Sequence, residues 1–285
     1  MTVEEDDDLV VEYLAAIDEL FEHWEAVDAK NPRLAQPAAR SASRFSSKDL
    51  ARLAIVKGLA CYVFDTGKAI RILHTAGQIN AMIPLVRLAY ESALNVSLLV
   101  QSLEQHGVDA FLHEYSRQRA ALQTNASRSP AEVFREGAPD VSGVDGSPFK
   151  DSRDSVRHLH QICDDLTPGG PDAYLYYRLL SAYSHPGVSV TDLYFEENDQ
   201  PGLPTFLGEA KEALPRGMLL FFTAASLLWS ARAYSYLTRD RTDRDFLRSV
   251  GRRIGVADSL ALSDAYRRRH AARARAEREA RRRSR

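Results

Sequence analysis

The chain has 285 residues, of which 45% are hydrophobic and 27% are charged, and its formal net charge is −2. These proportions are typical of a globular protein and exclude a disordered chain. A chain of this length also buries enough surface to fold without a disulfide or a structural metal.

Cellular location follows from three features of the sequence. The only cysteines are Cys61 and Cys163, which excludes a disulfide framework and fits a reducing compartment. The acidic run at residues 4–8 is the opposite of the basic start of a signal peptide. The most apolar stretch, residues 218–229, is shorter than the ~20 residues that a bilayer requires. We therefore expect a cytoplasmic protein with no membrane segment.

Helical periodicity of apolar residues recurs along the whole chain and predicts about seven to nine helices. In chain order they cover residues 4–29, 48–76, 81–105, 108–127, 151–165, 172–184, 209–238, 243–251, and from 257 into the tail. The first helix is long and amphipathic. In the third, residues 93–100 are apolar on all sides, which predicts the most buried helix, and Pro84 is acceptable there only near the first turn.

The intervening segments are rich in proline, glycine and small polar residues. Residues 31–43 are expected to form a linker, 129–147 a long connection, 188–195 a short strand or extended loop, and 198–202 a turn. The fold class is therefore an all-α helical bundle with an arginine-rich helical tail at the C-terminus. We divide the chain into residues 1–45 (first helix and linker), 46–240 (core bundle) and 241–285 (short helix and basic tail).

Residues 178–185 carry the main candidate site. Arg178 and His185 are two helical turns apart on one face, roughly 10–11 Å along the axis, with Ser181 between them and Ser184 beside the histidine. An imidazole can act as a general acid or base, and a guanidinium can hold a phosphate. The pair predicts metal-free cleavage of an RNA phosphodiester, with Arg178 and His185 catalytic. A structural role, capping carbonyls or pairing with an acid, is the alternative.

A second polar stripe, Arg87, Glu91 and Asn95, lies in the most apolar helix. Charges in such a helix are costly unless they are paired, so a salt bridge between Arg87 and Glu91 is the first expectation. The other is that the three residues support a polar pocket that faces Arg178 and His185.

Metal and cofactor sites have little support in the sequence. Asp154 and His158 share a face of a predicted helix, but no second pair completes a metal site, so a metal-dependent oxygenase is only a third hypothesis. Phosphate-binding glycine loops and the GxSxG, HExxH and CxxC motifs do not occur. We expect no cofactor and no metal.

The charge of the chain is divided unevenly. Residues 264–285 hold ten arginines against three acids, so the rest of the chain is acidic. A basic helix can follow a phosphate backbone, and the candidate nucleic-acid ligands are Arg267, Arg268, Arg269, Arg273 and Arg275. The tail can also bind the acidic body, or it can recruit a protein partner. In the second case, deleting residues 264–285 is expected to remove partner binding and to leave the fold intact.

Two resemblances follow from these stripes. Residues 84–87 with Glu91 and Asn95, and Tyr177-Arg178 with Ser181 and His185, resemble the uncharacterised domain-of-unknown-function 5677 family over about residues 50–237. The spacing of Arg178 and His185 also resembles the Rx4–6H motif of HEPN (higher eukaryotes and prokaryotes nucleotide-binding) domains. That resemblance implies a dimeric helical bundle, often a metal-independent endoribonuclease in toxin or defence systems. Pro186 and Ser184 depart from its usual motif.

The leading hypothesis is thus an HEPN-like cytoplasmic homodimer that binds RNA and cleaves it without metal. The alternative is a non-catalytic helical interaction module that dimerises and recruits a protein partner through its basic tail.

Overall fold

The computed structural model describes residues 3–30, 47–137, 140, 152, 154, 156–196, 205–238 and 243–283. Over these residues the protein is an all-α bundle with eleven helices and only four two-residue strands, which confirms the predicted fold class. The predicted linker at 31–43, the turn at 198–202 and both predicted domain boundaries lie outside the described residues.

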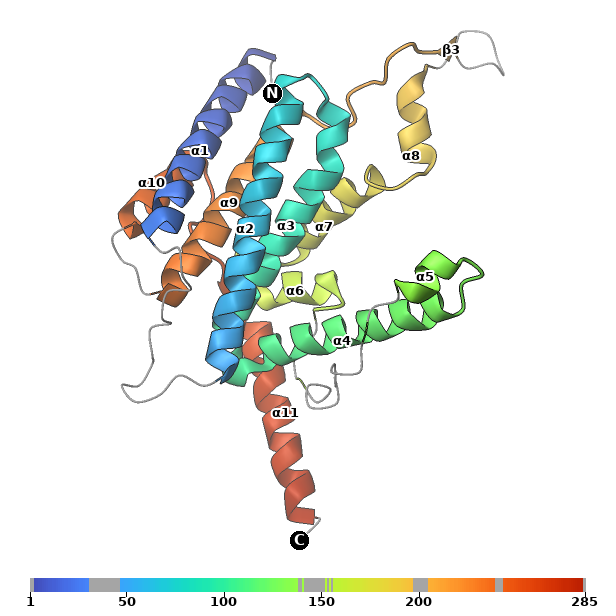
Figure 1. Ribbon diagram of the computed structural model, residues 1–285. Coiled ribbons are helices and arrows are strands. Elements are labelled where there is room, and N and C mark those ends of the chain that lie inside the picture. The colour runs from blue at the N-terminus through green and yellow to red at the C-terminus, as the bar shows by residue number, and fades with distance from the viewer. Residues whose placement is uncertain are drawn as a thin grey trace.

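Four long helices stand side by side and form the bundle (Figure 1). They are α1 (Val3–Lys30), α2 (Ser47–Thr75), α3 (Ile79–Gln101) and α9 (Arg216–Thr238). Helix α3 packs against both α2 and α9, while α1 packs mainly against α9. Aromatic rings fill the centre, with Trp24 of α1 stacked on Phe64 of α2 at 4.4 Å between ring centroids.

Helix α3 is the central element. Every residue from Ala93 to Val100 is buried, as the apolar sequence predicts. The helix starts at Ile79, so Pro84 lies beyond the first turn rather than within it, and the helix continues past it. Asn80, whose carbonyl loses its usual donor at Pro84, uses its side chain to bind Lys211 O (2.8 Å) and Ala213 N (2.9 Å).

Among the described residues, α3 is also the one helix long and apolar enough to cross a membrane. Of its most apolar window, 61% is buried inside the bundle.

Helices α6 (Leu159–Asp165) and α7 (Gly170–Ala182) pack against each other and against α3. The Tyr90 hydroxyl of α3 donates to Ala173 O of α7 at 3.3 Å, which ties the two helices together. Helix α6 is shorter than predicted: the residues described between 152 and 158 are not helical. Asp154 and His158 therefore do not share a helical face.

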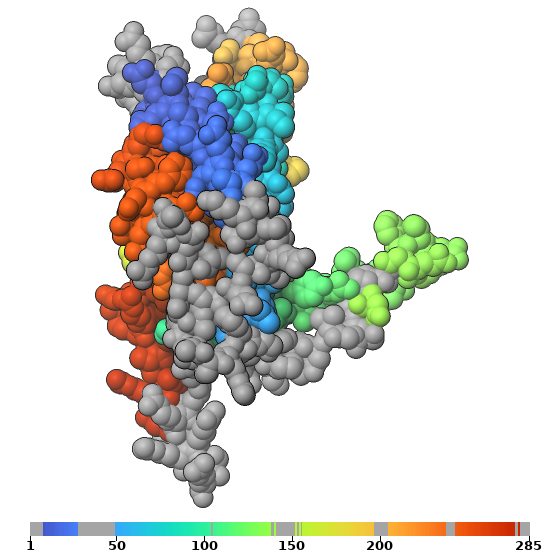
Figure 2. Space-filling model, turned by 60° about the vertical axis from the view of Figure 1, so that its left-hand side comes forward, coloured from blue at the N-terminus to red at the C-terminus, as the bar shows by residue number. Residues whose placement is uncertain are grey.

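Helix α4 (His106–Ser127) follows a 3₁₀ turn (Leu103–Gln105) and leaves the bundle as an arm that ends in α5 (Glu132–Glu136) (Figures 1 and 2). Only the first turn of α4 is buried. The short α5 lies in the segment predicted to be a connection.

The segment after α7 was predicted to be extended but is mostly helical. Helix α8 (Val188–Thr191) runs into a second 3₁₀ turn (Asp192–Tyr194). Short α5 and α8 account for the excess over seven to nine helices. The four strands form two antiparallel pairs: β1 (Leu166–Thr167) with β4 (Ala261–Leu262), and β2 (Phe195–Glu196) with β3 (Thr205–Phe206).

The C-terminal region belongs partly to the bundle. Helix α10 (Arg244–Arg253) packs on α9, and α11 (Asp264–Arg283) begins only after β4 has paired with β1. Tyr266 and His270 in the first two turns of α11 are buried, whereas the rest of the helix projects away from the bundle (Figure 1).

Candidate functional site

Arg87 of α3 and His185, in the turn after α7, meet at the surface of the bundle. Arg87 Nη1 lies 3.0 Å from His185 Nε2, and Arg87 Nη2 donates to the Tyr177 hydroxyl at 2.9 Å. The helix ends at Ala182, ahead of Pro186 and Gly187, and this stop leaves His185 exposed. The packing of α7 on α3 thus brings together one residue from each of the two polar stripes recognised in the sequence.

The chemistry of the contact fixes the state of His185. A guanidinium has donors and no acceptor, so His185 Nε2 accepts the hydrogen bond and the ring is the neutral tautomer with its proton on Nδ1. In this arrangement the Nε2 lone pair becomes available only when Arg87 Nη1 turns away from it. Arg87 itself is largely covered, with a side chain 19% exposed, so its charge acts in partly desolvated surroundings.

Glu91 completes the group on α3. Its Oε2 lies 4.0 Å from Arg87 Nη2, which makes the predicted salt bridge a loose one. Burial raises the pKa of Glu91 above its ordinary value, and the charge of Arg87 opposes that shift. The carboxyl therefore keeps its proton at a higher pH than a free glutamate does.

The remaining predicted residues lie outside this group. Arg178 is exposed on α7, and its side chain forms no hydrogen bond or ion pair with the described residues. The Ser184 hydroxyl donates to Leu180 O at 2.7 Å, and the Ser181 hydroxyl is buried without a hydrogen-bond partner. Asn95 is buried and donates to Glu91 O at 2.9 Å, along its own helix.

The sequence names Tyr177 only as part of the stripe with Arg178 and gives it no role of its own in the site. Its ring lies 5.1 Å from the Arg87 guanidinium carbon, so it contributes a cation–π contact as well as the hydroxyl acceptor. A signal existed in the sequence, since Tyr177 is one residue from Arg178 and one helical turn from Ser181, but periodicity alone does not distinguish it from the neighbouring tyrosines.

A second polar cluster, also missed from the sequence, is buried where α11 joins the bundle. His270 Nε2 lies 2.6 Å from Asp154 Oδ1, and the Tyr266 hydroxyl donates to Asp154 Oδ2 at 3.1 Å. The Tyr266 ring stacks on His270 at 4.1 Å. All three side chains are buried, so the cluster anchors α11. Asp154, expected beside His158, is thus engaged by the C-terminal helix.

The predicted tail arginines differ in their surroundings. Arg269 binds the buried carboxylate of Asp165, with Nη2 to Oδ2 at 2.6 Å, and Arg267 pairs with Asp264 at 3.1 Å. Burial raises the pKa of Asp165 and the Arg269 hydrogen bonds oppose this, so Arg269 is the charge that makes the buried acid tolerable. Arg268, Arg273 and Arg275 are exposed.

These buried contacts of α11 argue against the expectation that residues 264–285 can be deleted without harming the fold. Deletion would remove Tyr266 and His270 and would leave Asp154 and Asp165 buried without these partners.

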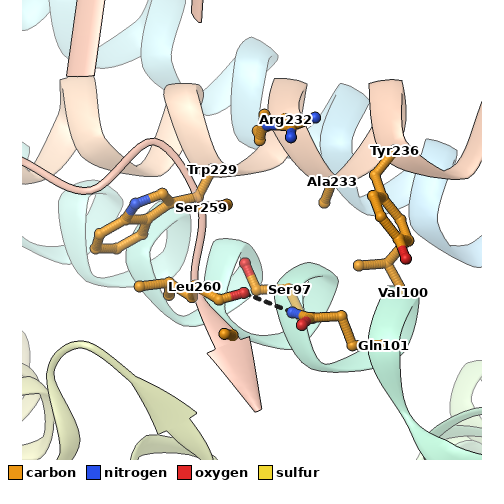
Figure 3. Close-up of a pocket in the computed structure, with 10 residues that line it drawn as sticks. Ser97, Val100, Gln101, Trp229, Arg232, Ala233, Tyr236, Ser259 and Leu260 are labelled. Carbon is orange, nitrogen blue, oxygen red and sulfur yellow. Dashed lines mark hydrogen bonds between the residues drawn. The ribbon is translucent and has the colours of Figure 1, made fainter. Parts of the chain in front are cut away.

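A pocket of about 160 Å³ lies between α3, α9 and the segment ahead of β4 (Figure 3). Gln101 Nε2 donates to Leu260 O at 2.5 Å. Trp229, which also lines the pocket, donates from Nε1 to the carbonyl of Ala257, outside the lining, at 2.8 Å. Arg232 Nε bonds to Asp258 Oδ2 at 3.2 Å. These contacts fasten the segment that leads into α11. Gln101 is fourteen residues from Arg87, about 21 Å along α3, so the pocket is separate from the Arg87–His185 contact.

Within the part of the chain that the structure describes, no group of three or more His, Cys, Asp or Glu residues is placed to hold a metal ion.

Comparison with known proteins adds no relative: no protein-family model, no curated protein and no solved structure matches the chain. The resemblances to the two families remain predictions from the motifs.

Proposed function

We propose that this protein binds RNA at the Arg87–His185 contact and cleaves it without a metal ion. The observation that carries the proposal is the 3.0 Å contact between a guanidinium and an exposed, neutral imidazole. These are the two groups that phosphodiester cleavage requires: one to hold the phosphate and one to move a proton.

The groups have distinct roles in this reaction. When the phosphate binds, Arg87 Nη1 turns from His185 Nε2 to the phosphoryl oxygens, and the freed Nε2 takes the proton of a ribose 2′-hydroxyl while the 2′-oxygen attacks the adjacent phosphorus. The bond from phosphorus to the 5′-oxygen breaks, leaving a 2′,3′-cyclic phosphate and a 5′-hydroxyl. Arg87 holds the phosphoryl oxygens as negative charge builds on them, and the Tyr177 hydroxyl hydrogen is available to the same oxygens. Glu91, whose pKa burial raises, supplies the proton to the 5′-oxygen.

In this assignment His185 retains the catalytic role that the sequence predicts for it. The residue that binds the phosphate is Arg87 rather than Arg178. Arg178 projects from the outer side of α7, where Leu175, Tyr176 and Leu179 are also exposed. An apolar patch beside a cation suits a protein interface. We place the predicted homodimer contact on this face. Leu179→Glu should convert the dimer to a monomer in light scattering, and an unchanged mass would remove the face from consideration.

The second candidate function is a non-catalytic interaction module. The α4–α5 arm favours it, because Leu122, Val133 and Phe134 are exposed on an element that stands away from the bundle (Figure 2). In this case His185 has no catalytic part, and the protein binds a partner without cleaving RNA.

Cleavage of a labelled single-stranded RNA by the full chain in EDTA distinguishes the two functions. The catalytic proposal expects cleavage in EDTA that ends in a cyclic phosphate and falls about 10²- to 10⁴-fold in His185→Ala. His185 is exposed, so the variant should retain the thermal stability of the wild type. Cleavage that EDTA abolishes, or that His185→Ala leaves unchanged, would refute it.

A further inference from the structure

Four aromatic side chains form a continuous row that starts at Arg87. Tyr177, whose hydroxyl Arg87 binds, stacks with Tyr174 at 6.1 Å between ring centroids. Tyr174 contacts His160 edge to face at 5.9 Å, and His160 lies 5.6 Å from His158. We call Tyr177, Tyr174, His160 and His158 the ring row.

Local structure explains how the row forms. Tyr174 and Tyr177 are three residues apart on α7 and therefore share a face. His158 caps α6 and His160 lies in its first turn, so the packing of α6 on α7 brings the histidines against the tyrosines. His158 and His160 are exposed, and the two tyrosines are half-buried. The row thus combines fixed rings with accessible ones.

The charges at the far end of the row offset each other and do not make it a phosphate site. Arg87 stands at one end, and the exposed Arg157 adjoins His158 at the other. Asp164, however, is exposed one turn after His160 on α6. A carboxylate there disfavours a phosphate, whereas the uncharged face of a nucleobase stacks on an imidazole or phenol regardless of sequence.

We propose that the ring row is a stacking platform for the unpaired bases of a single-stranded RNA whose scissile phosphate lies at Arg87 and His185. The proposal rests on the proposed function and adds a substrate class to it. Bases in a duplex are stacked within the helix and cannot lie on protein rings, so the row selects single strands. Stacking contacts of this kind tolerate any base, and the protein should have little sequence preference along the row.

The test measures binding apart from cleavage, in full-length protein that carries His185→Ala. The probes are a fluorescein-labelled oligouridylate and the same strand annealed to oligoadenylate. Adding Tyr174→Ala or His160→Ala should weaken single-strand binding about 5- to 150-fold each, while Tyr174→Phe, which keeps the ring, should bind as before. Tyr115→Ala is the matched control, since Tyr115 is exposed on α4, outside the row.

Tight binding of the duplex, or equal affinities for Tyr174→Ala, His160→Ala and the Tyr115 control, would overturn the ring row. Should Tyr174→Ala fail to fold, the exposed His160 still decides the matter. The two proposals fail separately. If the wild type cleaves RNA but the substitutions in the ring row leave the binding affinity unchanged, only the ring-row proposal is refuted. Protein that binds through the row but leaves RNA intact refutes the cleavage alone.

Discussion

Arg87 and His185 are 98 residues apart in the chain, yet Arg87 Nη1 lies 3.0 Å from His185 Nε2. The contact depends on α7 packing along α3 and on the end of α7 before Pro186. A guanidinium has only donors, so His185 Nε2 accepts this hydrogen bond, which positions the imidazole and places a positive charge beside it.

The two candidate arginines can be separated by substitution. Arg87→Ala should lower RNA cleavage about 10²- to 10³-fold, the usual cost of losing one donor to the developing charge. Arg87→Lys should recover only part of it, because lysine lacks the planar fork. Arg178→Ala should change single-turnover cleavage less than threefold at protein concentrations that keep the dimer intact. A large loss in Arg178→Ala with normal Arg87→Ala activity would return the catalytic role to Arg178.

Glu91→Gln should change the pH dependence of cleavage rather than abolish the reaction. A general acid acts while protonated, so the wild-type rate should fall as pH rises through the raised pKa of Glu91. Glutamine is similar in size but has no proton to lose or give, so the variant should be slower and should lack that alkaline decline. Rates measured across the pH range under single-turnover conditions check this. An alkaline limb that persists in Glu91→Gln would mean that another group is the acid.

Sequence periodicity was sufficient for the long helices and for the buried centre of α3, because apolar residues at helical spacing report packing directly. It could not pair Arg87 with His185, since nothing in the spacing within one helix specifies the neighbour on another. The sequence nevertheless placed both residues in candidate sites, because charged residues are unusual in an apolar helix and a histidine directly before Pro-Gly is unusual at a helix end.

The C-terminal helix shows where composition misleads. Its arginines predicted a tail that is not needed for the fold, but Tyr266 and His270 are buried among them and Arg269 neutralises Asp165. Tyr266 and His270 are only two buried positions, four residues apart. Two positions give too weak a periodic pattern to predict a buried face in a segment with ten arginines. The start of α6 was misplaced for a related reason: Asp154 is held by a tertiary contact with His270, not by a helix.

Loss of His270 should destabilise the protein strongly. His270→Ala leaves the buried Asp154 carboxylate with the Tyr266 hydroxyl as its remaining hydrogen-bond partner among the described side chains, and breaking a buried pair of this kind costs about 3 kcal/mol. Urea denaturation measures the change. His270→Gln, which keeps a donor, should lose less. Arg268→Ala, an exposed change on the same helix, should stay within about 0.5 kcal/mol. Equal stabilities for the alanine variants would show that the cluster does not anchor α11.

The tail arginines should divide into two groups when they are replaced singly. Arg269→Ala should lower the free energy of unfolding, because it leaves the buried Asp165 unpaired. Arg268→Ala and Arg275→Ala, at exposed positions, should leave stability unchanged and weaken RNA binding if the projecting part of α11 contacts phosphates. Each lost contact should reduce the slope of log K against log salt by about 0.7 for a single strand. Titrations of a cleavage-inactive His185→Ala background at several salt concentrations measure the slopes. Unchanged slopes would show that these arginines do not contact RNA. The exposed half of α11 would then have no role in nucleic-acid binding, which would favour the hypothesis that it binds a protein partner.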